Sequence, residues 1–164
     1  MKPQTQEFPM HEPQNGVIGD CFRAALASLL GLGIRQVPHL AKEYFGDEQG
    51  YDQALNQFLG KRGLMLLLFP YGQLSKLLQE QAQSTGADCY HLIFGIDHDG
   101  DGHACVGLNG LMIHDPHPLQ RGFANPPSEW QIGLMVNRLS DAPMDDGHQS
   151  IDALLHGADP WDCS

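Results

Sequence analysis

The sequence predicts an α+β fold, with helices in the first half of the chain and antiparallel strands in the second. Two observations lead to this prediction. Apolar residues after Cys21 recur at the i, i+3, i+4 and i+7 spacing of a helix. After Thr85, short apolar runs alternate with turns rich in Gly, Asn and Asp, as in β-hairpins. Helices that are separated along the chain from antiparallel strands are typical of the α+β class.

The best-defined helix is predicted to begin at Cys21. Asp20 precedes it, and an aspartate in this position is suited to capping free backbone N–H groups. Apolar side chains on nearly every side indicate that this helix is central and buried, and Gly31 and Gly33 end it. The other helical segments have a single apolar face. The expected helical segments are residues 21–30, 39–45 (one or two turns), 51–62 and 73–83.

Short apolar runs predict the strands. The run that ends at Pro70 suits a buried strand, and Asn109-Gly110 favours a tight turn between two others. The expected strands are residues 64–69, 90–96, 103–108, 111–115 and 132–139. The segments 1–19 and 116–127, which are rich in Pro and Gly, are expected to be irregular.

Length and charge restrict the organisation of the chain and its partners. With 164 residues, the chain is expected to form one domain over residues 1–139, followed by an acidic tail over 140–164 that contains no Lys or Arg. A net charge of −11 argues against a nucleic-acid partner, which needs a basic surface. No segment approaches the ~20 apolar residues of a membrane helix, so no membrane partner is expected.

The cysteines and the N-terminal residues predict a cytoplasmic protein. A secretory signal has an apolar segment after its basic residues. The first residues of this chain contain a single basic residue, Lys2, and no apolar segment follows it. The four cysteines have no metal-finger spacing, and we expect free thiols in a reducing compartment rather than a disulfide framework.

Three residues have the order and setting of a thiol-based catalytic site. Cys21 opens a helix, whose N-terminus favours a thiolate. His103 begins a strand after a glycine-rich loop, and Asp115 follows on the next strand. A thiolate, an imidazole and an orienting carboxylate are the groups that nucleophilic acyl transfer needs.

The β-hairpin between these strands tests the assignment of Asp115. With a two-residue turn at Asn109-Gly110, Asp115 would lie on the face opposite His103, because a one-residue shift reverses every side chain. A three-residue loop over 108–110, with Gly110 left-handed, would bring His103 and Asp115 together. The triad therefore requires the longer loop or an equivalent bulge.

Two further patterns concern the oxyanion and metals. Gln14 or Asn15, just upstream of Cys21, is the candidate for a side-chain oxyanion donor beside a backbone N–H. The acidic run 97–102 resembles the start of a calcium loop but lacks the glutamate required at its twelfth position, Leu108. Zinc ligation by Cys89, His91, His103 and Cys105 is conceivable but disfavoured, because the alternation of side chains along a strand offers no strong chelating pair. We expect no metal and no cofactor.

These motifs resemble the papain-like cysteine peptidases, and most closely their small bacterial and phage branches, such as the leader peptidases of bacteriocin export. The resemblance covers roughly residues 14–118 and rests on Gly19-Asp20-Cys21, on residues 102–107 and on His114-Asp115-Pro116. It implies a helix carrying the cysteine packed on an antiparallel sheet. It also implies that Cys21 is the nucleophile, that His103 is the base and acid, and that Asp115 orients His103.

In that family the oxyanion amide is a glutamine six residues before the cysteine. Here this position is Asn15, whereas the glutamine is Gln14. The predicted function is hydrolysis of a peptide, isopeptide or other amide bond in a peptide or protein substrate. The alternatives are acyl transfer to an amine, as in transglutaminases, and a non-enzymatic peptide-binding module on the same fold.

Overall fold

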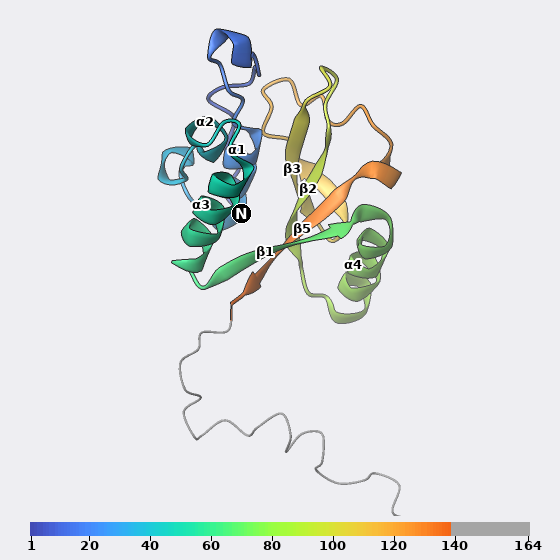
Figure 1. The fold of residues 1–164 in the computed structure, drawn as a ribbon. Helices are drawn as coiled ribbons and strands as arrows, with labels where there is room; N and C mark the ends of the chain where they lie inside the picture. Colours follow the sequence, from blue (N-terminus) through green and yellow to red (C-terminus); the bar gives the residue numbers. More distant parts are fainter. Residues whose placement is uncertain (139–164) are drawn as a thin grey trace, which may run out of the picture.

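The computed structural model describes residues 1–138, which form a single antiparallel sheet with helices on both of its sides (Figure 1). The strands lie in the order β1-β5-β2-β3-β4, and every neighbouring pair is antiparallel. Their bounds are β1 Leu64–Pro70, β2 Tyr90–Ile96, β3 Gly102–Leu108, β4 Leu111–His114 and β5 Gln131–Asn137. The predicted α+β class is thus confirmed.

The helices divide between the two sides of the sheet. Figure 1 shows α1, α2 and α3 grouped on one side and α4 on the other. Their bounds are α1 Cys21–Leu30, α2 Leu40–Glu43, α3 Glu48–Gly60 and α4 Tyr71–Thr85, and short 3-10 turns occupy Pro13–Asn15 (η1), Ile34–Gln36 (η2) and Pro127–Glu129 (η3). None of the helices within residues 1–138 has the length and apolar character needed to cross a bilayer.

Helix α1 packs directly on β2 and β3. Its central residues are small, and Ala25 contacts Leu92, Ala104 and Val106 without any solvent exposure at its own side chain. Small side chains allow a helix backbone to approach a sheet closely, which places the first residue of α1 near the start of β3. Gly31, with a φ of 69°, closes the helix in the left-handed conformation that the sequence predicted for a glycine stop.

A second cluster fills the space between α1 and α3. It contains Leu26, Val37 and Leu59, all of which are buried, with the side chains of β1 and β5 packed against it. Helix α3 begins at Glu48, earlier than predicted, because the carboxylate of Asp47 accepts a hydrogen bond from the N–H of Gly50 at 2.9 Å. Apolar burial on both sides of α1 makes it the central helix, as expected.

The N-terminal segment is irregular, as predicted, but it is fixed to the domain. The N–H of Lys2 donates to the carbonyl of Ser28, and the N–H of Gln6 donates to the carbonyl of Pro116. This segment therefore lies between the end of α1 and the chain that follows β4. The predicted boundary at residue 139 and the predicted acidic tail 140–164 lie outside the described residues.

Candidate active site

The turn of the β3–β4 hairpin has two residues, not three. Leu108 pairs with Leu111, and both Asn109 (φ 52°) and Gly110 (φ 80°) have the positive φ of a tight hairpin turn. The three-residue loop, the first of the two arrangements that would allow the triad, is therefore not formed. By itself this turn would direct Asp115 away from the face of His103.

A β-bulge reverses that consequence. The register shifts between Val106 and Gly107, so that Ile113 is an extra residue in β4. From that point the alternation of side chains is displaced by one residue. Asp115 therefore lies on the same side of the sheet as His103. This bulge has the effect that the triad requires, because it replaces the longer loop.

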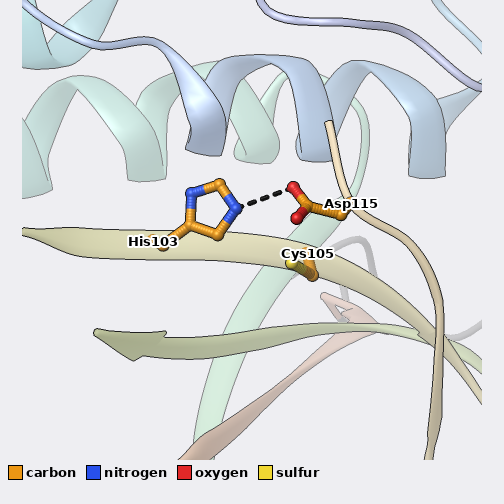
Figure 2. A group of neighbouring side chains, drawn as sticks. All are labelled: His103, Cys105 and Asp115. Atoms are coloured by element: carbon orange, nitrogen blue, oxygen red, sulfur yellow. Dashed lines mark hydrogen bonds and ion pairs between the residues drawn. The ribbon is translucent and has the colours of Figure 1, made fainter. Parts of the chain in front are cut away.

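The His103 ring and the Asp115 carboxylate form a buried pair. Nε2 of His103 lies 2.8 Å from Oδ1 of Asp115, and the two residues are only 5% and 8% exposed (Figure 2). The carboxylate also accepts backbone N–H groups of His117 and Gly122, each at 2.8 Å. The loop that follows β4 thus fixes the carboxylate, and the carboxylate fixes the ring.

Charge is favoured on both members of the pair. Burial by itself opposes the charged forms. Burial is the largest single influence on the pKa of His103, but the hydrogen bond with Asp115 and the smaller contributions of the Cys105 and Cys21 thiols together outweigh it and raise this pKa to about 12. The same bond, with two backbone N–H groups, outweighs burial and lowers the pKa of Asp115. At neutral pH the pair is therefore an imidazolium and a carboxylate.

Cys21 lies at the junction of α1 and β3. It is the first residue of α1, and its thiol donates to the carbonyl of Gly102 with an Sγ–O distance of 3.6 Å. Gly102 directly precedes His103 in β3. The thiol is thus held at a helix N-terminus beside the histidine strand, and Cys21, His103 and Asp115 are brought together as predicted from the sequence.

A cleft of ≈ 640 Å³ opens over Cys21 and His103. Three segments that are distant in sequence form its walls: part of residues 6–12, the loop between β2 and β3 (97–102), and residues 117–121. The cleft therefore exposes the thiol to a ligand, while the Asp115 carboxylate lies behind the histidine ring. A solvent-accessible nucleophile with a buried orienting group is the arrangement that acyl transfer to a cysteine needs.

The two candidate oxyanion amides do not line this cleft. Gln14 and Asn15 lie in the 3-10 turn η1 and are exposed, and the Asn15 amide donates to Glu12 at 2.9 Å. Their distance in sequence from Cys21 is suitable, but the chain between them turns away from the thiol. The structure does not bring either of them to the site.

Gln6 is the amide that lines the cleft instead. The residue is 8% exposed, its Nε2 donates to the carbonyl of Phe8 at 3.3 Å, and its Oε1 is buried with no hydrogen-bond partner among residues 1–138. Gln6 could not be recognised from the sequence, because it lies in an irregular segment with no local pattern. Only its contact with Pro116, through its backbone N–H, places it beside the site.

Asp20 has a different role from the predicted one. Its side chain does not cap α1. Its two oxygens accept the backbone N–H groups of Phe8, at 2.9 Å, and Glu7, at 3.3 Å, and the Arg23 guanidinium lies 3.5 Å away. The buried carboxylate thus anchors the N-terminal wall of the cleft, and no side chain of residues 1–138 accepts a hydrogen bond from the first N–H groups of α1.

Cys105 adds a second thiol beside His103. The ligating atoms of His103, Cys105 and Asp115 lie within 4.8 Å of one another, a spacing that could hold a metal ion (Figure 2). The hydrogen bond between His103 and Asp115 explains why two of these three groups lie close together without a metal ion. Cys89 and His91, the other members of the sequence-derived zinc set, do not belong to this group. Nδ1 of His91 contacts the Cys89 carbonyl instead.

The acidic run between β2 and β3 forms a closed turn. Oδ1 of Asp97 accepts the backbone N–H groups of Asp99, at 2.9 Å, and Asp101, at 3.0 Å. This carboxylate organises the loop that borders the cleft. The sequence pattern that resembles a calcium loop thus has a structural explanation in the turn itself.

Comparison of the chain with protein-family models, with curated proteins and with solved structures found no match.

Proposed function

We propose that the protein is a cysteine hydrolase of papain-like type, which cleaves an amide bond in a peptide or protein with Cys21 as nucleophile, His103 as acid and base, and Asp115 as the residue that orients His103. The observation that carries the proposal is the buried hydrogen bond between His103 and Asp115 beneath a cleft that contains Cys21. A buried imidazolium next to a thiol favours the thiolate, which is the nucleophilic form.

The first half of the reaction would acylate the enzyme. The Cys21 thiolate attacks the carbonyl carbon, an S–C bond forms, and the carbonyl π electrons move to oxygen. The oxyanion then re-forms the carbonyl as the C–N bond breaks, and the leaving amine takes its proton from His103. This step leaves a thioester on Cys21 and a neutral His103.

The second half would release the acid. His103 removes a proton from water as the water oxygen attacks the thioester carbon. The C–S bond then breaks and the thiolate and imidazolium are restored. Asp115 stays ionised throughout, because its role is to hold the ring in one orientation and to stabilise its charged form.

The oxyanion would be stabilised at the N-terminus of α1. The backbone N–H of Cys21 is the first of the helix, and Asp20 does not cap this end. Such N–H groups are free donors with a favourable dipole. The proposal therefore relies on a backbone donor, because Gln14 and Asn15 lie outside the cleft.

The test is a cleavage assay on a peptide library, made by digesting an unrelated proteome. New amine termini are identified by mass spectrometry after incubation with the wild type, Cys21→Ser and Cys89→Ser. We expect cleavage by the wild type and Cys89→Ser and none by Cys21→Ser. Cleavage that persists in Cys21→Ser would contradict the proposed nucleophile.

Thiol labelling gives an independent measurement. Burial raises the pKa of the Cys89 and Cys105 thiols, so both should react slowly with iodoacetamide in the native protein. Cys21 should be alkylated faster than either in slightly acidic buffer. Equal rates for the three thiols would argue against a catalytic cysteine.

A further inference from the structure

The cleft over Cys21 is acidic. Its carboxylates come from two walls: Glu12 from the N-terminal segment, and Asp97, Asp99 and Asp101 from the loop between β2 and β3. Among the described residues that line the cleft, Arg121 is the only Lys or Arg, and it is already paired with Asp99 at 3.2 Å. The remaining charge at the cleft is therefore negative.

Among the carboxylates that line the cleft, Asp101 is the nearest in sequence to His103. Within residues 1–138 its side chain makes no hydrogen bond and no ion pair, although it is half-buried, whereas Asp97 is engaged in the turn. The next residue, Gly102, accepts the Cys21 thiol through its carbonyl. An unpaired, partly buried carboxylate thus stands one residue from the contact that holds the nucleophile.

Gln6 provides an independent observation on the same cleft. It comes from a different segment, its side chain is more than nine-tenths buried, and its Oε1 has no donor among the described residues. A buried acceptor without a partner is costly and needs an explanation. Gln6 lines the cleft but its Oε1 is closed to solvent, so a rotation of the amide would be needed to bring this acceptor to a hydrogen-bond donor on a ligand.

We propose that the cleft binds substrates that carry a cationic N–H donor, such as the ammonium of lysine or the guanidinium of arginine, close to the carbonyl that Cys21 attacks. This inference rests on the proposed function and defines its substrate class. Asp101 supplies the charge partner and Gln6 supplies a neutral acceptor. Negative walls in a cleft concentrate a cationic ligand. The positive N-terminal end of α1 interacts with the negative charge that develops on the carbonyl oxygen of the same substrate.

Charged thiol reagents test the electrostatics without a known substrate. The reagents are aminoethyl methanethiosulfonate, which is a cation, and sulfonatoethyl methanethiosulfonate, which is an anion. In each reaction the Cys21 thiolate attacks the thiosulfonate sulfur, a new S–S bond forms, and methanesulfinate leaves. The measured quantity is the ratio of the two rates at Cys21, followed by mass spectrometry of the peptide that contains it.

Two variants show whether a difference between the two rates at Cys21 comes from the charge in the cleft. Asp101→Asn removes the charge without changing the shape of the side chain, and Asp52→Asn removes an exposed charge in α3, outside the cleft. The intrinsic reactivity of each reagent cancels when ratios are compared between variants. We expect the cation-to-anion ratio to fall by about threefold or more in Asp101→Asn, as for a partly exposed charge pair, and to be unchanged in Asp52→Asn. It should also fall as salt is added.

The peptide library supplies the matching result for substrates. Bonds cut by the wild type should be enriched in Lys or Arg beside the cleavage point, and Asp101→Asn should reduce this enrichment. If Cys21 is reactive and the library is cut, but the rate ratio is the same in Asp101→Asn and no cation is enriched, this inference is wrong and the proposed function stands. If Cys21 is unreactive and nothing is cut, both are wrong.

Discussion

His103 and Asp115 face each other at 2.8 Å only because β4 contains one extra residue, Ile113. The two-residue turn of the hairpin would otherwise direct the carboxylate to the opposite face. A carboxylate that is fixed by a bulge, by two backbone N–H groups and by an imidazole has a single orientation. Its contribution to the site can therefore be tested by conservative substitution.

Asp115→Asn should reduce activity far more than it reduces stability. The amide keeps the shape of the side chain but loses the charge that favours the imidazolium, and it presents an NH₂ group or a weaker acceptor to His103. The corresponding substitution in a serine protease triad lowers kcat by about 10⁴, and we expect a loss of at least about 10² here. Peptide cleavage and urea unfolding of the same samples measure the two effects. A change in activity no larger than the change in the folded fraction would contradict the orienting role.

The same pair should give the protein a defined pH range of maximum stability. The lowered pKa of Asp115 means that its contribution is present above its ordinary value of 3.8 and is lost as the pH falls through the lower folded value. The raised pKa of His103 means that its contribution is complete below its ordinary value of 6.5 and is lost as the pH rises towards the higher folded value. The full contribution of the pair should therefore span the interval between 3.8 and 6.5. Urea midpoints of the wild type minus those of Asp115→Asn should be largest in that interval, and a difference that is independent of pH would reject the ion pair.

Gly107 and His91 should be energetically coupled. They are opposite one another on β2 and β3, and a Cβ at Gly107 would overlap Nε2 of the buried His91 ring. Gly107→Ala should therefore cost about 1–3 kcal/mol of unfolding free energy through overpacking. His91→Ala removes the ring, so the double variant should be more stable than the sum of the two single losses predicts. Strict additivity in urea unfolding would show that the ring does not limit this position.

Asp20→Ala should loosen the N-terminal wall of the cleft. The substitution leaves two backbone N–H groups without their acceptor and removes the buried partner of Arg23. Arg23 keeps its ion pair with Glu7 at 3.3 Å, so the expected cost is that of the partly buried N–H groups left without an acceptor, about 1–3 kcal/mol each. Limited proteolysis should cut within residues 1–12 sooner than in the wild type, and Asp52→Asn is the control for the loss of a surface charge. An unchanged cleavage pattern would mean that other contacts hold this segment.

Sequence alone determined the elements that depend on local pattern. The helix that begins at Cys21 and ends at Gly31, the strands near residues 64–69, 90–96 and 103–108, and the α+β class follow from apolar spacing and from glycine stops, both of which act over a few residues. Cys21, His103 and Asp115 could also be recognised from the sequence as a candidate catalytic set, because each stands at one end of a predicted helix or strand.

Tertiary structure decided what depends on contacts between distant segments. The bulge at Ile113 is set by pairing between strands, and nothing in the local sequence distinguishes it from a longer loop. Gln6 reaches the cleft through Pro116, 110 residues away in the chain, whereas Gln14, although closer to Cys21 in sequence, turns outward. Asp20 serves the N-terminal segment rather than its own helix because Glu7 and Phe8 offer their N–H groups at short range. The periodicity of a sequence indicates which face of a helix or strand is apolar. Which segments contact that face depends on how the whole chain packs.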